Sequence, residues 1–196
     1  MIVRVLQAIE RLEPRAMVAI AGAPASGKST LAEAVVASLG DRAALVPMDG
    51  FHLDDAVLED RGHRDRKGAP WTYDTGGFLS VLERLKRREE VAVPVFDRGL
   101  ELARAGARVI SPEVEVVVVE GNYLLLDEDP WRGMRPIYDL TVLLDMPVEV
   151  LEARLRARWD QYGKADAEGW IAANDLPNAR IVADRSGGAD ITLPPE

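Results

Sequence analysis

The sequence predicts an α/β fold in which a mostly parallel, five-stranded sheet is flanked by helices. Two observations lead to this prediction. Apolar runs short enough to be buried strands alternate along the chain with segments of helical periodicity, as in strand–helix–strand units. The run VEVVVVE at 114–120 is continuous and β-branched, which is typical of a parallel strand covered on both faces.

The first half of the chain shows clear starts and stops for these elements. Pro14 ends the first helical pattern, Gly40 stands where a helix C-cap belongs, and Asp74 is a plausible N-cap. Between the second strand and Asp74 the pattern is irregular. We expect helices over 2–13, 28–39 and 74–89, and strands over 16–21, 43–48 and 92–96.

The second half continues the alternation. A small hairpin-like piece is expected around Gly106. We see no internal repeat, low-complexity tract or linker, so we expect one domain over 1–196. The remaining strands are expected over 114–120, 139–144 and 190–193, and the remaining helices over 148–160, 166–173 and 177–184.

Composition narrows the class of protein. The 196 residues are 47% hydrophobic and 29% charged, which fits a globular chain that needs no covalent staples. The absence of cysteine excludes disulfide scaffolds, thiolate zinc sites and thiol nucleophiles. No apolar run is long enough for a transmembrane helix or a signal peptide, so we expect a cytoplasmic protein without membrane contact.

Charge is unevenly distributed. Acidic residues outnumber basic ones 33 to 24, and the net charge of −9 argues against broad nucleic-acid binding. Eleven of the 24 bases nevertheless fall in three short segments, 61–67, 84–88 and 154–158. The segment 84–88 fits the basic end of an amphipathic helix. The segments 61–67 and 154–158 indicate binding of small anionic ligands.

A phosphate-binding pattern lies at residues 22–30, which read GAPASGKST and match G-x-x-x-x-G-K-[ST]. An apolar strand precedes it and an alanine-rich helix begins at Lys28, which is the context that the chemistry requires. Glycines let consecutive backbone N–H groups point at phosphate oxygens, and the helix N-terminus adds partial positive charge. Lys28 can reach the β and γ phosphates, while the Ser29 hydroxyl can bind Mg²⁺. We therefore expect a nucleoside triphosphate to bind here.

Two acidic residues directly follow apolar strands. Asp49 closes ALVPMD and Glu120 closes VVVVE, and ligands of open parallel sheets bind beyond the carboxyl ends of the strands. Phosphoryl transfer to a hydroxyl needs a carboxylate near Mg²⁺ and a base for the hydroxyl proton. Asp97, at the end of AVPVFD, is either a third such carboxylate or a turn residue.

Five segments together resemble the phosphoribulokinase/uridine kinase superfamily, and most of all its pantothenate-kinase-like branch, which includes proteins described as fructose transport system kinases. The likeness covers about residues 15–184. It implies a P-loop NTPase fold with a small helical lid at about 151–175, ATP and Mg²⁺ as cofactors, and a small-molecule acceptor. The segments are GAPASGKST, MDGFHLDD at 48–55, RKGAPWTYD at 66–74, PVFDRGLE at 94–101 and VVVVEGNYLLLD at 116–127.

The resemblance also implies roles for individual residues. Asp49 corresponds to the general base, Glu120 lies near Mg²⁺ together with Ser29, and Lys28, Arg154 and Arg158 act on the transferring phosphoryl group. Arg154 and Arg158 are four residues apart, so they share a helix face that Arg156 does not. Nucleotide contacts are expected from Gly22, Ala23, Pro24, Ala25, Ser26, Gly27, Lys28, Ser29, Thr30 and Asn178. Acceptor contacts are expected from His52, Arg64, Arg66, Lys67, Tyr73, Asp97, Arg98, Asn122 and Asn174, with Asp74 bordering the same pocket.

The chain departs from the family pattern at Phe96, where a tyrosine is usual, and it is shorter than a full pantothenate kinase. The acceptor, the preference for ATP over GTP, and self-association as a homodimer are therefore left open. A GTP-driven switch is disfavoured: DTGG at 74–77 fits D-x-x-G, but no apolar strand precedes Asp74 and no N-K-x-D element follows. A P-loop protein that only hydrolyses or senses ATP for a transport system stays the alternative.

Overall fold

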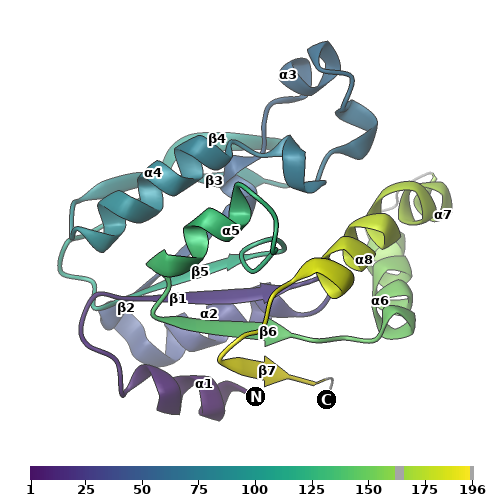
Figure 1. The fold of residues 1–196 in the computed structure, drawn as a ribbon. Coiled ribbons are helices and arrows are strands. Elements are labelled where there is room, and N and C mark those ends of the chain that lie inside the picture. Colours follow the sequence, from purple (N-terminus) through teal and green to yellow (C-terminus); the bar gives the residue numbers. More distant parts are fainter. Residues whose placement is uncertain (162–165, 195–196) are drawn as a thin grey trace.

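A computed structural model describes residues 1–161 and 166–194 of the chain. Its centre is a five-stranded sheet with the order β2-β5-β1-β6-β7, in which every neighbouring pair is parallel (Figure 1). The predicted α/β fold with five sheet strands is thus confirmed. The strands are β1 (Ala16–Gly22), β2 (Ala43–Pro47), β5 (Val116–Gly121), β6 (Leu140–Leu144) and β7 (Ile191–Leu193).

Helices cover both faces of this sheet. On β1, Met17 and Ala19 pack into one apolar layer, while Val18 and Ile20 pack into the other. Because side chains alternate along a strand, a central strand with two covered faces is apolar on both, as residues 116–119 of β5 are. One layer is formed with α4 (Thr75–Lys86), α5 (Trp131–Met134) and α8 (Leu176–Arg185), and the other with α1 (Ile2–Ile9) and α2 (Lys28–Leu39).

The carboxyl ends of the central strands lie at one edge of the sheet. In register, Gly22 on β1 stands beside Leu144 on β6, and Glu120 on β5 stands beside Pro47 on β2. The same edge faces α6 (Val148–Gln161), which Figure 1 shows beyond the arrowheads of the strands. Residues far apart in sequence therefore meet there.

A separate antiparallel hairpin, β3 (Val91–Asp97) with β4 (Leu102–Ile110), packs beside α4. Its turn lies at 98–101 and not at Gly106, where the sequence placed the hairpin. Gly106 instead sits inside β4 with φ +63°, near a register shift between Val93 and Val95. A glycine inside a strand commonly marks such an irregularity, which sequence alone does not distinguish from a turn.

Two further expectations need correction. The segment 49–73 contains a helix, α3 (Asp55–Asp60), which starts because the Asp54 side chain accepts a hydrogen bond from the Ala56 amide at 2.9 Å. The first helix ends at Ile9, because the amides of Arg11 and Leu12 bond back to Ala8 and Ile9 in turns that lead the chain toward β1.

The C-terminal helices form one continuous unit. Instead of two separated helices, α7 (Ala167–Trp170) runs into a π-helical turn, Ile171–Asp175, and then into α8. Residues 162–165 of the predicted lid lie outside the described residues. Within the described part of the chain, no helix combines the length and apolarity needed to cross a bilayer.

Candidate active site

The phosphate loop, residues 22–30, follows β1 directly and ends in α2. Gly27 is the N-cap of α2 with φ +96°, a conformation that side chains other than glycine rarely adopt. Gly22 is tightly enclosed, because an added Cβ would lie 2.5 Å from Ser26 Oγ and 3.2 Å from the carbonyl oxygen of Leu144. The local geometry therefore favours glycine at both positions of the pattern. The loop presents backbone amides and the start of a helix to an anion.

Ser29 and Glu120 meet across the edge of the sheet. Ser29 Oγ donates a hydrogen bond to Glu120 Oε2 at 3.1 Å, which links the first turn of α2 to the end of β5. Glu120 is buried. Burial raises the pKa of Glu120, and the nearby Asp49 charge raises it further, while Lys28 and the Ser29 hydrogen bond oppose this shift. The pair thus forms a buried oxygen cluster beside the loop.

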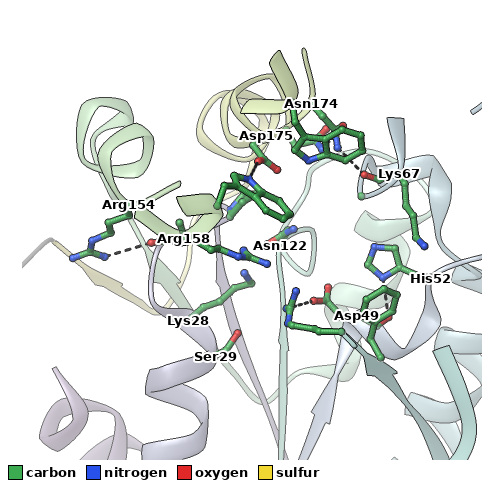
Figure 2. A pocket seen from close by; sticks show the side chains of 18 of the residues that line it. Lys28, Ser29, Asp49, His52, Lys67, Asn122, Arg154, Arg158, Asn174 and Asp175 are labelled. Carbon is green, nitrogen blue, oxygen red and sulfur yellow. Dashed lines mark hydrogen bonds and ion pairs between the residues drawn. The ribbon is translucent and has the colours of Figure 1, made fainter. Parts of the chain in front are cut away.

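Lys28 is the first residue of α2, and its ammonium group interacts with the carboxylates of Glu120 and Asp49. Burial lowers the pKa of Lys28, and the charges of Glu120 and Asp49 partly counteract that effect. Figure 2 shows the side chains of Lys28 and Arg158 pointing into the same space above Ser29. Lys28 from α2 and Arg158 from α6 therefore face the position where the loop can bind phosphate.

Asp49 lies in the 3-10 turn that follows β2, Met48–Phe51. Its carboxylate accepts a hydrogen bond from Arg98 at 3.1 Å and is 26% exposed. Burial alone would raise the pKa of Asp49, but His52, Lys28 and Arg98 together hold it below its ordinary value. Asp49 is therefore ionised at neutral pH.

The backbone around Asp49 explains its orientation. Gly50 packs against the Pro94 carbonyl so closely that any Cβ would collide with it. His52 Nδ1 bonds to the backbone carbonyl of Asp49 at 2.8 Å, and the His52 ring stacks against Tyr73, with 4.2 Å between ring centroids. The turn is thus held from both sides, and it aims Asp49 at the phosphate loop.

Helix α6 supplies the arginines. Arg154 donates to the carbonyl of Ser26 at 3.1 Å, so it holds the outer side of the phosphate loop. Arg158 lines the cavity next to Lys28. Arg156 instead pairs with Glu152 at 2.6 Å and with Glu168 at 2.8 Å, as its different helix face predicts.

These groups surround one cavity of about 940 Å³, large enough for a nucleotide and a small second substrate. Most residues that the sequence assigned to the site line it. They are Pro24, Ala25, Gly27, Lys28, Ser29, Thr30, Asp49, His52, Arg64, Lys67, Tyr73, Arg98, Asn122, Arg154, Arg158, Asn174 and Asn178.

The other assigned residues are absent from the lining that the described part of the chain forms: Gly22, Ala23, Ser26, Arg66, Asp97 and Glu120. Gly22 and Ser26 belong to the phosphate loop itself, and Glu120 touches the lining through Ser29. Asp97 is a turn residue, because its carboxylate accepts from the amides of Gly99 and Leu100 at 3.0 and 3.1 Å.

Asp74 caps α4 through the Gly77 amide at 2.9 Å. It therefore serves the helix rather than the cavity, and the D-x-x-G pattern at 74–77 has this structural explanation.

Arg66 has a different position from the one expected. Its guanidinium donates to Asn178 Oδ1 at 3.2 Å and to Asn174 Oδ1 at 3.4 Å. Asn174 in turn donates to the Lys67 carbonyl at 2.8 Å. Both asparagines are buried. This network fastens the segment around Lys67 to the π-helical turn and α8, and a π-helical turn is often found at a functional position.

The cavity also includes residues that the sequence analysis did not assign to it: Gly68, Phe96, Glu101, Trp159, Trp170 and Asp175. Trp159 donates from its indole to Asp175 at 2.6 Å, which joins α6 to the π-helical turn. The signal in the sequence that could have identified Trp159 is its position in a strongly charged helix, where a large apolar side chain is unusual. Nothing in the sequence marks Glu101, which enters the cavity only through the hairpin turn.

The family model described as the phosphoribulokinase/uridine kinase family matches residues 17–162. A fission yeast (Schizosaccharomyces pombe) protein named "Putative uridine kinase C227.14" is 32% identical, over 95% of this chain and 87% of its own. Listeria monocytogenes pantothenate kinase is 33% identical over 71% of this chain, but the match spans only 49% of that enzyme.

Among solved structures, a "putative fructose transport system kinase" from Silicibacter sp. TM1040 is 43% identical, covers 99% of both chains and has a TM-score of 0.92. Phosphoribulokinase from Rhodobacter sphaeroides has a TM-score of 0.62 at 12% identity, covering 91% of this chain and 69% of its own, which indicates a shared fold.

Proposed function

We propose that this chain, which belongs to the phosphoribulokinase/uridine kinase family of ATP-dependent small-molecule kinases, transfers the γ-phosphoryl group of ATP to a hydroxyl group of a small metabolite. One observation carries the proposal. Lys28, Asp49 and Arg158 come from three separate elements and line the same cavity, beside the Ser29–Glu120 pair. That is the set of groups that phosphoryl transfer to an alcohol requires.

On the nucleotide side, the phosphate loop and Lys28 bind the β and γ phosphates. Arg158 approaches from the other side and neutralises charge that develops on the transferring group. Arg154 holds the Ser26 carbonyl and so keeps the loop in the shape that binds phosphate. Arg154 thereby has a positioning role, distinct from that of Arg158.

The donor set near Ser29 fits Mg²⁺. A serine hydroxyl and a carboxylate 3.1 Å apart are hard oxygen ligands, and Mg²⁺ in kinases takes one or two such ligands plus substrate phosphates. Among residues 1–161 and 166–194, no cluster of three or more metal-ligating side chains competes with this assignment. When bound, Mg²⁺ would neutralise phosphate charge.

On the acceptor side, Asp49 is the general base. It is ionised and lies in the cavity, coupled electrostatically to Lys28. The acceptor hydroxyl oxygen forms a bond to the γ phosphorus while the bond from that phosphorus to the bridging oxygen of ADP breaks. The hydroxyl proton passes to an Asp49 carboxylate oxygen. Arg98, hydrogen-bonded to that carboxylate, fixes its direction.

The test is acceptor-dependent turnover. The purified chain with MgATP is assayed for ADP formation and, with γ-labelled ATP, for a phosphorylated acceptor, across a panel of sugars, polyols, nucleosides and pantothenate. We expect both products in equal amounts with at least one acceptor. ADP formation that no acceptor accelerates would favour the alternative function, an ATPase or ATP sensor. A cytoplasmic location and self-association as a homodimer stay predictions from the sequence.

A further inference from the structure

We infer that the acceptor is an uncharged polyhydroxyl compound, such as a neutral sugar or polyol, rather than a carboxylate or a sugar phosphate. This inference rests on the proposed kinase function and concerns the acceptor half of its cavity. That half is formed by residues from the segments 49–73 and 96–101, on the side of Asp49 that faces away from Arg154.

The basic residues of this half already have acidic partners. Lys67 donates to Asp55 at 2.6 Å and to the Glu101 carbonyl at 2.9 Å, and its side chain is only 7% exposed. Arg64 pairs with the other oxygen of Asp55 at 2.7 Å. A carboxylate or phosphate on the acceptor would have to compete with Asp55 for both cations.

Arg66 and Arg98 are engaged as well. Arg66 is turned to Asn174 and Asn178, and Arg98 is bound to the base Asp49. An anionic acceptor that captured Arg98 would break the hydrogen bond that orients Asp49. Three of the four bases in the cluster 61–67, which the sequence assigned to an anionic ligand, therefore make internal contacts: Arg64, Arg66 and Lys67.

The cations that line this half have acidic partners. Arg64 and Lys67 both pair with Asp55, and Arg98 pairs with Asp49. The phosphate half, by contrast, holds Lys28, Arg154 and Arg158 around a loop of backbone amides. A buried charge is tolerated only with a compensating partner, so the phosphate half suits an anion and the acceptor half does not.

Apart from its paired cations, the acceptor wall offers groups that accept hydrogen bonds. Because a backbone carbonyl can only accept, the 2.8 Å contact with Asp49 O puts the proton of the His52 ring on Nδ1 and leaves Nε2 as an acceptor. Burial lowers the pKa of His52, which keeps the ring neutral at physiological pH. The Asp49 carboxylate and the backbone carbonyl of Glu101 are also acceptors. Such a wall is satisfied by hydroxyl donors.

An aromatic surface completes the wall. The ring of His52 lies between those of Tyr73 and Phe96, with centroid distances of 4.2 and 4.9 Å. Their faces carry partial negative charge, which attracts C–H groups rather than anions. The aliphatic face of a sugar or polyol offers such C–H groups, and its hydroxyls offer the donors.

The experiment compares acceptors that differ in charge at one position and keep the hydroxyl groups at their other positions. A pair is used only where the hydroxyl that is phosphorylated, located in the isolated product by NMR, is free in both members. The pairs are fructose with fructose 6-phosphate, ribose with ribose 5-phosphate, glucose with gluconate, glycerol with glycerate, and panthenol with pantothenate. In each pair that is phosphorylated, we expect kcat/KM of the neutral member to exceed that of the anion at least tenfold. Preference for anions would overturn the inference and leave the kinase function intact. If neither these compounds nor any acceptor of the wider panel is phosphorylated, both the inference and the proposed kinase function are overturned.

A variant tests the charge balance itself. Asp55→Asn keeps the shape of the side chain but leaves Lys67 and Arg64 without their shared acid, so the preference for the neutral acceptor should fall at least tenfold. Asp54→Asn is the matched control, because it removes a neighbouring charge while asparagine still caps α3. Should Asp55→Asn fail to fold, Glu101→Gln removes one acidic group of the wall and should shift the preference in the same direction. An unchanged preference in a folded Asp55→Asn protein, or in Glu101→Gln, would contradict the inference.

Discussion

Arg154 and Arg158 stand one turn apart on α6, yet they contact different parts of the site. Arg154 binds the Ser26 carbonyl of the phosphate loop at 3.1 Å, whereas Arg158 lines the cavity near Lys28. Helical spacing predicts that both lie on one face of the helix, and both line the cavity beside the phosphate loop, while Arg156 lies on another face. It does not separate the residue that faces the phosphates from the residue that holds the loop.

Arg158→Ala is expected to lower kcat by about two to three orders of magnitude with little change in the Kd for ATP, because its charge acts mainly in the transition state. Arg154→Ala should instead weaken ATP binding by about threefold to tenfold, since it frees a loop that must be ordered. Arg156→Ala is the control and should change neither. Equal losses in all three variants would contradict these distinct roles. Steady-state kinetics and calorimetric titration with ATP provide both readouts.

Lys28→Ala should lower kcat by about two to four orders of magnitude, because a cation aimed at the γ phosphate contributes about 3–5 kcal/mol in the transition state. The fold should survive, since Lys28 faces the cavity and packs into neither apolar layer of the sheet. Thermal unfolding should stay within about 2 °C of the unmodified chain. A variant that keeps more than about a tenth of the original turnover would contradict the assignment of the phosphate loop.

The acid limb of the pH profile should depend on Mg²⁺. Burial raises the pKa of Glu120, so as pH falls this residue becomes protonated while Asp49, whose pKa is lowered, is still ionised. Protonated Glu120 cannot bind the metal, and excess Mg²⁺ should therefore move the loss of kcat/KM to lower pH.

Glu120→Gln is the control for this dependence on Mg²⁺. The terminal phosphate of ATP also takes up a proton in this pH range, and it does so equally with the variant and with the unmodified chain. The shift with Mg²⁺ should be smaller in Glu120→Gln than in the unmodified chain. A shift of the same size in the two proteins would assign the acid limb to ATP and contradict the role of Glu120.

Arg15 is expected to matter for stability. It is buried with φ +76°, and its guanidinium donates to the carbonyls of Leu85, Ser111 and Val114 at 2.6, 3.2 and 2.9 Å. Arg15→Ala would remove these three buried or partly buried hydrogen bonds and should cost about 2–5 kcal/mol of unfolding free energy. Denaturant titration measures this cost. Arg11→Ala, at an exposed position, should cost less than about 0.5 kcal/mol. Equal effects of the two changes would contradict the role of Arg15.

The sequence predicts those parts of the site that are set by local chemistry. The phosphate loop, the position of Glu120 beside Ser29 and that of Asp49 in the cavity follow from strands that end in glycine or acid at one edge of a parallel sheet. These features depend on residue order and on the common direction of the strands.

What the sequence does not predict depends on contacts between distant segments. Arg66 donates to Asn174 and Asn178, more than a hundred residues away, and does not itself line the cavity. Lys67 and Arg64 share Asp55, whose helix is only six residues long and buries only Leu58. Glu101 reaches the cavity through the β3–β4 turn. Short polar segments of this kind carry too little periodicity to place their side chains.

The central claim is that Asp49 is the base for transfer to an acceptor hydroxyl. It is tested most directly by measuring, in one preparation of Asp49→Asn, the Kd for ATP, the rate of acceptor phosphorylation and the slow rate of ATP hydrolysis without acceptor. Asparagine keeps the shape and hydrogen bonding of the side chain but cannot take the proton. We predict that ATP binding is retained within about threefold, that phosphorylation falls by about two to four orders of magnitude, and that hydrolysis falls less. If phosphorylation survives while ATP binding collapses, Asp49 is a ligand of the nucleotide or its metal and not the base.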